Sequence, residues 1–151
     1  LNSAALNDKK IINESAIKFG SQCIVVSVDC KKNNKDRYIV YENCGQKSTG
    51  IEVTEWCKIV EAQGAGEILI NSIEKDGTLE GYDLDLIKMV TSNVSIPVLA
   101  AGGAGNWSHF VDCFKIGKVS GACTTNIFHF TENSIINAKN YLKKQNLRVR
   151  L

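Results

Sequence analysis

The chain repeats one local pattern, an apolar strand that stops at a polar loop punctuated by glycine. It occurs in GEILINSIEKDGTLEG, from Gly66 to Gly81, and again in IPVLAAGGAG, from Ile96 to Gly105. In α/β barrels and doubly wound sheets, ligands bind at the carboxyl ends of parallel strands. The repetition therefore restricts the chain to a parallel α/β architecture and predicts a phosphate-handling site at the strand ends.

The hydrophobic periodicity extends this pattern into four strand-then-helix units. The predicted strands are 23–28, 67–71, 97–101 and 119–123, and the helices that follow them are 54–63, 83–91, 106–116 and about 132–144. A helix over 8–19 precedes these units, and a small β-hairpin from residue 38 separates the first strand from its helix. Crossovers of this length imply parallel strands. A full (β/α)₈ TIM barrel needs about 250 residues, so we expect residues 1–151 to form a single partial barrel domain. Its open edges favour self-association.

Composition excludes several classes of function. The net charge of +2 gives no general attraction to nucleic acid, and no apolar run is long enough for a membrane span. The six cysteines contain no CxxC pair, so we expect free thiols and a reduced, cytoplasmic environment. The two histidines, His109 and His129, lie far from each other and from any cysteine pair, so we expect no metal and no cofactor.

Two aspartates stand where predicted strands end. Asp29 follows the apolar run CIVVSV, and Asp76 lies in the loop EKDGT. A partly buried carboxylate at such a strand end is a candidate general acid or base. The alternative for Asp29 is an ordinary turn cap, and from position alone the two interpretations are equally good. Asp76 by itself is a turn former, and only its place at the same barrel end favours a function.

Two further loops favour a phosphorylated ligand. Gly102 and Gly103 lie between a strand and a helix, where backbone N–H groups can approach an anion. The next strand ends in Thr124-Thr125-Asn126, which offers hydroxyl and backbone donors. Glu67 opens its strand at the opposite end, and the residues alone favour a solvated strand start there.

Together these motifs resemble the cyclase subunit of imidazole glycerol phosphate synthase, a (β/α)₈ barrel of histidine biosynthesis. The matching stretches, which span the chain in order, are FGSQCIVVSVDCK, STGIEVTEWC, GAGEILINSIEKDGTLEGYDLDLI, IPVLAAGGAG, NIFHF and YLKKQNLRVRL. The resemblance covers the C-terminal part of that family. It implies that the N-terminal half of the barrel is missing and that Leu1-Asn2-Ser3 ends the fourth strand.

The resemblance also implies a reaction. The family takes ammonia from a glutaminase partner and delivers it through the barrel to a ribulosyl-formimino carboxamide nucleotide. The products are imidazole glycerol phosphate and an aminoimidazole carboxamide ribonucleotide. Two aspartates act as acid and base, of which one matches Asp29 and the other belongs to the first strand of the family's barrel. The phosphate-binding positions match Asp76, Gly77, Gly102, Gly103, Thr125 and Asn126 at one end of the substrate, and Asn2 and Ser3 at the other. Glu67 matches a member of the charged ammonia gate, and Gln22 matches a residue near the channel mouth.

Some positions depart from the family's pattern. Asn71 stands where the family commonly has Thr, and Ala101 and Asn126 stand where it commonly has Ser. The segments NSI, GYDLDLI and GGAGN resemble those of paralogues from bacterial surface-sugar gene clusters. This resemblance implies an ammonia-handling subunit with a different acceptor. A third alternative is a non-catalytic half-barrel that self-associates. Because the family's first-strand aspartate has no counterpart here, we expect these 151 residues alone to be inactive.

Overall fold

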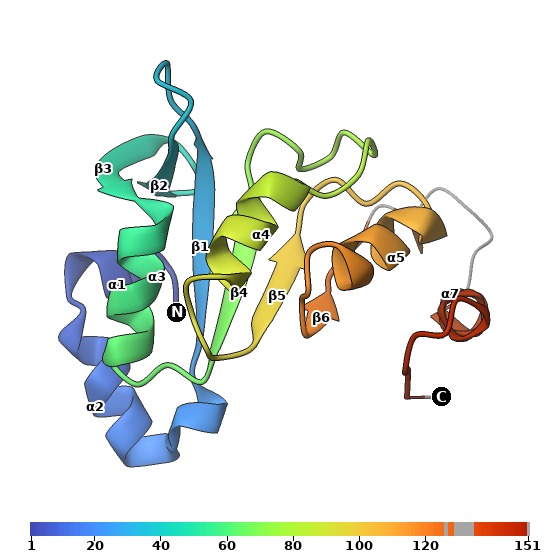
Figure 1. The fold of residues 1–151 in the computed structure, drawn as a ribbon. Coiled ribbons are helices and arrows are strands. Elements are labelled where there is room, and N and C mark those ends of the chain that lie inside the picture. Colours follow the sequence, from blue (N-terminus) through green and yellow to red (C-terminus); the bar gives the residue numbers. More distant parts are fainter. Residues whose placement is uncertain (126, 129–134, 151) are drawn as a thin grey trace.

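The computed structural model describes residues 1–125, 127–128 and 135–150, and it contains a six-stranded sheet with helices packed along one face (Figure 1). The strand order is β3-β2-β1-β4-β5-β6. The four strands β1 (Val25–Lys32), β4 (Glu67–Ser72), β5 (Val98–Ala101) and β6 (Gly121–Ala122) run parallel. They form a twisted parallel sheet with crossover helices, the arrangement that builds (β/α) barrels.

The crossover helices follow the strands in the predicted alternation. They are α3 (Val53–Ala62), α4 (Leu84–Thr91) and α5 (Trp107–Lys115), and α7 (Ile135–Lys144) follows β6. The predicted alternation of strand and helix is therefore confirmed. Strand 119–123 is shorter than predicted, and the start of the predicted helix 132–144 lies outside the described residues. That residues 1–151 are a single partial domain stays a prediction.

The predicted hairpin is present, and its pairing changes the predicted bounds of the first strand. Its strands are β2 (Tyr38–Glu42) and β3 (Lys47–Glu52), and β2 pairs antiparallel with β1 from Asp29↔Tyr41 to Lys32↔Tyr38. The prediction that the first strand stops before Asp29 is wrong, because this pairing extends β1 to Lys32. The predicted start was also wrong, since Cys23 belongs to the 3₁₀ turn η1 (Ser21–Cys23).

The N-terminal segment lies against the same sheet. The Leu1 amino group donates to the Val25 carbonyl at 2.7 Å, and the Ser27 N–H donates to the Leu1 carbonyl at 2.7 Å. The short α1 (Ser3–Asn7) and then α2 (Lys10–Phe19) follow, and α2 confirms the predicted helix over 8–19. These bonds place Asn2 beside the second half of β1.

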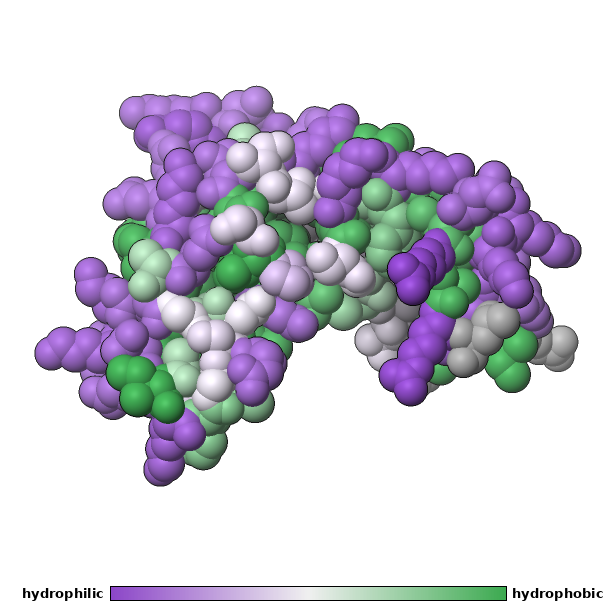
Figure 2. All heavy atoms as spheres, turned by 60° about the horizontal axis from the view of Figure 1, so that its bottom comes forward, coloured by the Kyte–Doolittle hydropathy of each residue, from purple (hydrophilic) through white to green (hydrophobic). Residues whose placement is uncertain are grey.

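The two faces of the sheet differ in burial. Val26, Val28 and Cys30 of β1 are almost completely buried against the helix layer, whereas Ser27 and Asp29, between them, are half-buried on the other face. The same alternation continues in β4. Figure 2, with the N-terminal ends of β4 and β5 turned forward, shows a concave outline between the α2 side and the α7 side. Asp29 therefore lies on the face of the sheet opposite the helix layer.

Within the described ranges, no helix combines the length and hydropathy that crossing a bilayer requires.

Candidate functional site

A cavity of about 260 Å³ lies at the carboxyl ends of the parallel strands. Its lining comes from the strands β1, β4 and β5 and from the loops after β4, β5 and β6: Ser27, Asp29, Leu69, Asn71, Asp76, Gly77, Leu79, Ala101, Gly102, Gly103, Ala104, Cys123, Thr124 and Thr125. The structure therefore brings Asp29, Asp76 and the paired glycines to one rim. The strand topology explains why, because parallel strands end at the same edge of a sheet.

Asp29 is held by amide groups from both sides. Asn2 Nδ2 donates to Asp29 Oδ2 at 2.9 Å, and Asn71 Nδ2 donates to Asp29 Oδ1 at 2.9 Å. Asn71 lies opposite Asp29 in the β1–β4 register. Each carboxylate oxygen thus accepts one hydrogen bond and keeps capacity for another. Asp29 is a half-buried carboxylate, held in one orientation at the wall of the cavity.

The glycine pair forms the tightest part of the rim. Gly102 has φ +88° and Gly103 has φ +99°, a region in which L side chains are strained. A Cβ on Gly103 would lie 2.1 Å from the Gly81 carbonyl oxygen. The Gly81 N–H also donates to the Gly103 carbonyl at 2.7 Å. The loops after β4 and β5 are therefore joined backbone to backbone, and only glycine fits at position 103.

Several backbone N–H groups around the cavity have no hydrogen-bond partner in the described part of the chain. Among the described residues, the N–H groups of Gly77, Gly103, Ala104 and Thr125 donate to no protein acceptor. Gly103 and Ala104 are buried, and buried N–H groups are rarely left unpaired. Unpaired backbone donors converging from three loops are typical of an anion site. The cavity can therefore bind a phosphate group through the main chain.

Sequence reasoning missed the side chains that hold these loops. His109 Nδ1 accepts from the Gly105 N–H at 3.1 Å, and Asn106 Oδ1 caps α5 by accepting from the Ser108 and His109 N–H groups. On the neighbouring loop, the Tyr82 hydroxyl donates to the Cys123 carbonyl at 3.0 Å. The polar GNxxH spacing of Gly105 to His109 was the available signal for the first contact. No sequence pattern predicts the hydrogen bond from Tyr82 to Cys123.

A buried polar cluster joins the hairpin to the loop after β4. Asp83 accepts from the Leu86 N–H, which caps α4, and from the Tyr38 hydroxyl at 2.8 Å. Ser72 Oγ also donates to Asp83, at 3.4 Å. Burial, and then the hydrogen bond to Asp83, raise the pKa of Tyr38 well above its ordinary value. Tyr38 therefore acts as a neutral donor that fixes Asp83 at the start of α4.

Among the described residues, the other predicted site residues lie outside the cavity lining. Ser3 Oγ accepts from the Asn43 N–H at 3.1 Å, beside the hairpin. Glu67 begins β4 and lies about 13 Å from Asn71 along the strand, at the opposite end of the sheet. Among the described residues, it makes no ion pair. Gln22 is exposed in η1, and Asn126 lies outside the described residues.

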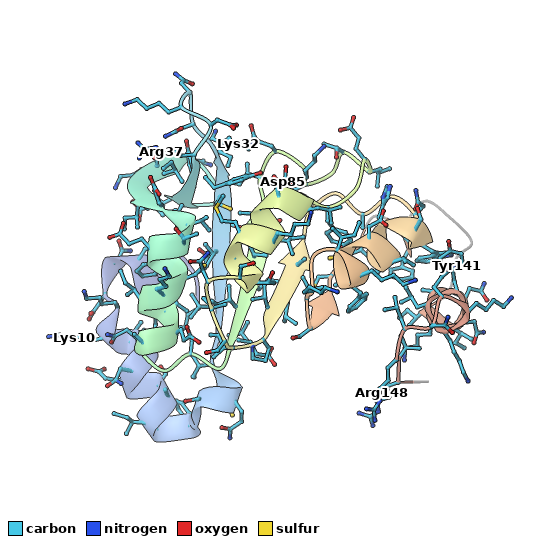
Figure 3. All side chains as sticks on the ribbon, viewed as in Figure 1. Lys10, Lys32, Arg37, Asp85, Tyr141 and Arg148 are labelled. Carbon is cyan, nitrogen blue, oxygen red and sulfur yellow. The ribbon has the colours of Figure 1, made fainter. Side chains whose placement is uncertain are left out.

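The end of β1 and the turn between β1 and β2 carry positive charge beyond Asp29. A second hollow is lined by Lys31, Lys32, Lys35 and Arg37 together with Tyr41, Glu74 and two asparagines. Lys32 ends β1 and Arg37 precedes β2, and Figure 3 shows both near the top of the molecule. Lys32 pairs with Asp36 at 2.8 Å and Arg37 pairs with Glu52 at 2.5 Å, so part of this charge is neutralised locally. Elsewhere in the described ranges, no cluster of His, Cys, Asp or Glu has the composition of a metal site.

Comparison with known proteins agrees with this geometry. A family model described as "Histidine biosynthesis protein" matches residues 1–134. The chain belongs to the histidine biosynthesis protein family. The family resemblance expected from the sequence is thereby confirmed, and so is its TIM-barrel fold class.

Curated relatives give the same family. The chain is 48% identical to the imidazole glycerol phosphate synthase subunit HisF of Hydrogenobaculum sp. (strain Y04AAS1) over 151 residues, which is 100% of this chain and 60% of that protein. It is 45% identical to HisF of Chlorobium limicola (strain DSM 245 / NBRC 103803 / 6330) with the same coverage, and 45% identical to HisF of Prochlorococcus marinus (strain NATL1A), where 99% of this chain and 59% of that protein align. The chain thus spans about 60% of the length of these family members.

Proposed function

We propose that this protein serves as the cyclase subunit of an imidazole glycerol phosphate synthase. In that role it uses ammonia from a glutaminase partner to form imidazole glycerol phosphate and aminoimidazole carboxamide ribonucleotide. The observation that carries the proposal is the single cavity shared by the Asp29 carboxylate and the glycine-rich loops. Membership of the histidine biosynthesis protein family and HisF relatives at 45–48% identity support the proposed reaction.

The site supports a division of roles. Asp29 serves as one of the acid/base carboxylates, because it is half-buried, oriented, and open to the cavity. One phosphate group of the substrate binds the unpaired N–H groups of the loops that carry Gly77, Gly103 and Thr125, with Asp76, Gly102 and Asn126 completing that end. Asn2 and Ser3 serve the other phosphate end, beyond Asp29.

Ammonia reaches this cavity from the opposite end of the sheet. Glu67 lies at that end, on the face of β4 that carries Leu69 and Asn71. Because successive side chains of a strand alternate between faces, residues 67, 69 and 71 line one path. We assign Glu67 to the gate of this path, and Gln22 to its mouth. The free cysteines and the soluble substrates fit a cytoplasmic enzyme.

A second function is favoured by one specific observation. Asn71 and Ala101, which replace the family's usual Thr and Ser, both line the cavity and are paired in the β4–β5 register. Changed side chains at the substrate wall favour a changed acceptor. The alternative function is therefore amidation of a surface sugar with the same ammonia chemistry.

One experiment separates these functions. The gene, taken at its natural length, is expressed in a histidine auxotroph that lacks its own cyclase subunit, and the purified protein is assayed with the ribulosyl-formimino nucleotide and ammonium. Growth together with imidazole glycerol phosphate formation is the expected result. Failure of both in a folded protein would contradict the histidine-pathway function and favour the surface-sugar paralogue.

The non-catalytic, self-associating half-barrel is tested by mass in solution. Light scattering of the 151-residue chain distinguishes a monomer from an assembly. A strict monomer across micromolar concentrations would contradict self-association through the open sheet edges.

A further inference from the structure

We propose that Asn71 and Asn2 are positioning residues for Asp29, and that Asn71 makes in this protein the contact that orients the carboxylate toward the cavity. The inference rests on the proposed function and deepens it. Two amide groups, from β4 and from the segment before α1, hold one carboxylate oxygen each at 2.9 Å. A carboxylate fixed at both oxygens cannot rotate about its terminal torsion, which is otherwise broad.

The geometry of the sheet explains why Asn71 can reach. Asp29 and Asn71 are partners in the parallel register of β1 and β4, and both line the cavity. Neighbouring strands lie about 4.8 Å apart, so a side chain that carries its donor on the γ carbon spans the gap to a neighbouring aspartate. A threonine hydroxyl in the same place is one atom shorter. Asn71 thus reaches Asp29 at 2.9 Å, across a gap that a shorter hydroxyl side chain spans less well.

The state of Asn2 supports the same interpretation. Asn2 Oδ1 is buried without a hydrogen-bond partner among the described residues. Turning the amide over would set Oδ1 against the Asp29 carboxylate and lose the charge-assisted bond of Nδ2. The orientation of Asn2 is therefore dictated by Asp29 and not by the needs of its own carbonyl group. Asn2 therefore leaves its own buried Oδ1 unpaired in order to donate to Asp29, which supports a role in positioning this carboxylate.

Direct contact with the substrate is the competing role for Asn71, because its side chain also lines the cavity. The two roles differ in kinetics. A substrate contact made equally in the ground and transition states raises KM when it is removed, whereas loss of a positioning contact lowers kcat. A misplaced catalytic group costs about 100-fold in rate for a displacement near 1 Å.

The first measurement needs no activity. In ¹H–¹⁵N spectra of the 151-residue chain, the Asp29→Asn substitution should shift the side-chain amide resonances of both Asn2 and Asn71. The amide of Asn93, which donates to the Met89 carbonyl outside the cavity, should stay in place. Unmoved Asn2 and Asn71 resonances in a folded variant would overturn the proposal.

The second measurement uses the protein at its natural length with ammonium and substrate. Asn71→Leu should lower kcat by up to about 100-fold with KM changed less than about twofold. Asn71→Thr, which restores a hydroxyl donor, should recover part of the loss. Asn93→Leu is the matched control and should leave both constants unchanged. A raised KM at unchanged kcat in Asn71→Leu would overturn the positioning role. An inactive wild-type protein would contradict the proposed function, while the amide resonances would still decide whether Asp29 is clamped.

Discussion

Substituting alanine for Gly103 should cost far more stability than the same substitution at Gly77. Both residues line the cavity and both have positive φ, +99° and +79°. A Cβ at Gly77 meets nothing within 4 Å, so Gly77→Ala carries only the backbone strain, about 1–2 kcal/mol. A Cβ at Gly103 lies 2.1 Å from the Gly81 carbonyl oxygen, so strain is joined by a collision with main chain.

The expected loss for Gly103→Ala follows from three contributions. Backbone strain contributes about 2 kcal/mol, forced separation of two packed loops about 1–3 kcal/mol, and loss of the Gly81–Gly103 hydrogen bond about 1 kcal/mol. The sum, about 4 kcal/mol or more, is a large fraction of the stability of an ordinary domain.

Urea unfolding followed by circular dichroism measures both variants against the parent chain. A midpoint for Gly103→Ala well below that of Gly77→Ala, or no folded baseline at all, is the expected result. Equal losses, within about 1 kcal/mol, would refute the close approach of the two loops.

Three further predictions concern the fold around the site. Tyr38→Phe should lower the free energy of unfolding by about 1.5–3 kcal/mol, because Asp83 loses a charge-assisted bond from a buried donor; an unchanged urea midpoint would contradict this. Glu61→Gln should destabilise the chain at neutral pH, since the hydrogen bonds from Ser95 hold the pKa of Glu61 below its ordinary 4.5. The difference in unfolding free energy between variant and parent should be complete above pH 4.5 and disappear as the pH falls through the lowered pKa. A difference that persists in acid would contradict this prediction. A thiol reagent at pH 8 should modify the exposed Cys23, Cys44 and Cys123 of the native chain. Cys30, Cys57 and Cys113 should stay unmodified because they are buried, and burial also raises the pKa of Cys57 and Cys113 to about 12. Rapid reaction of all six cysteines would contradict the packing of the helix layer.

The sequence predicts those parts of the fold that depend on local periodicity. The alternation of strand and helix was readable because each apolar run is short and is followed by a polar residue or glycine, and because caps such as Asn106 mark helix starts. The C-terminal end of β1 was not readable, because it is decided by pairing with the hairpin strand β2, from Asp29↔Tyr41 to Lys32↔Tyr38. Local patterns carry no information about that register.

The candidate site likewise has features that the sequence predicts and features that it does not. The placement of Asp29 and Gly103 at one rim follows from parallel topology, so strand order alone predicts it. The clamp of Asn2 and Asn71 on Asp29 depends on which residues face each other across strands, and the collision that requires glycine at position 103 depends on a second loop. Both are tertiary contacts, and a single sequence shows neither.

The most direct test of the account is the turnover of Asp29→Asn in the protein at its natural length, supplied with ammonium and the ribulosyl-formimino nucleotide. Loss of the carboxylate should lower imidazole glycerol phosphate formation by at least about 100-fold, with the unfolding midpoint little changed. Asp85→Asn, at an exposed position in the first turn of α4, is the matched control and should keep full activity. Turnover by Asp29→Asn equal to that of the wild type would contradict the assignment of Asp29 and, with it, the function proposed for the cavity.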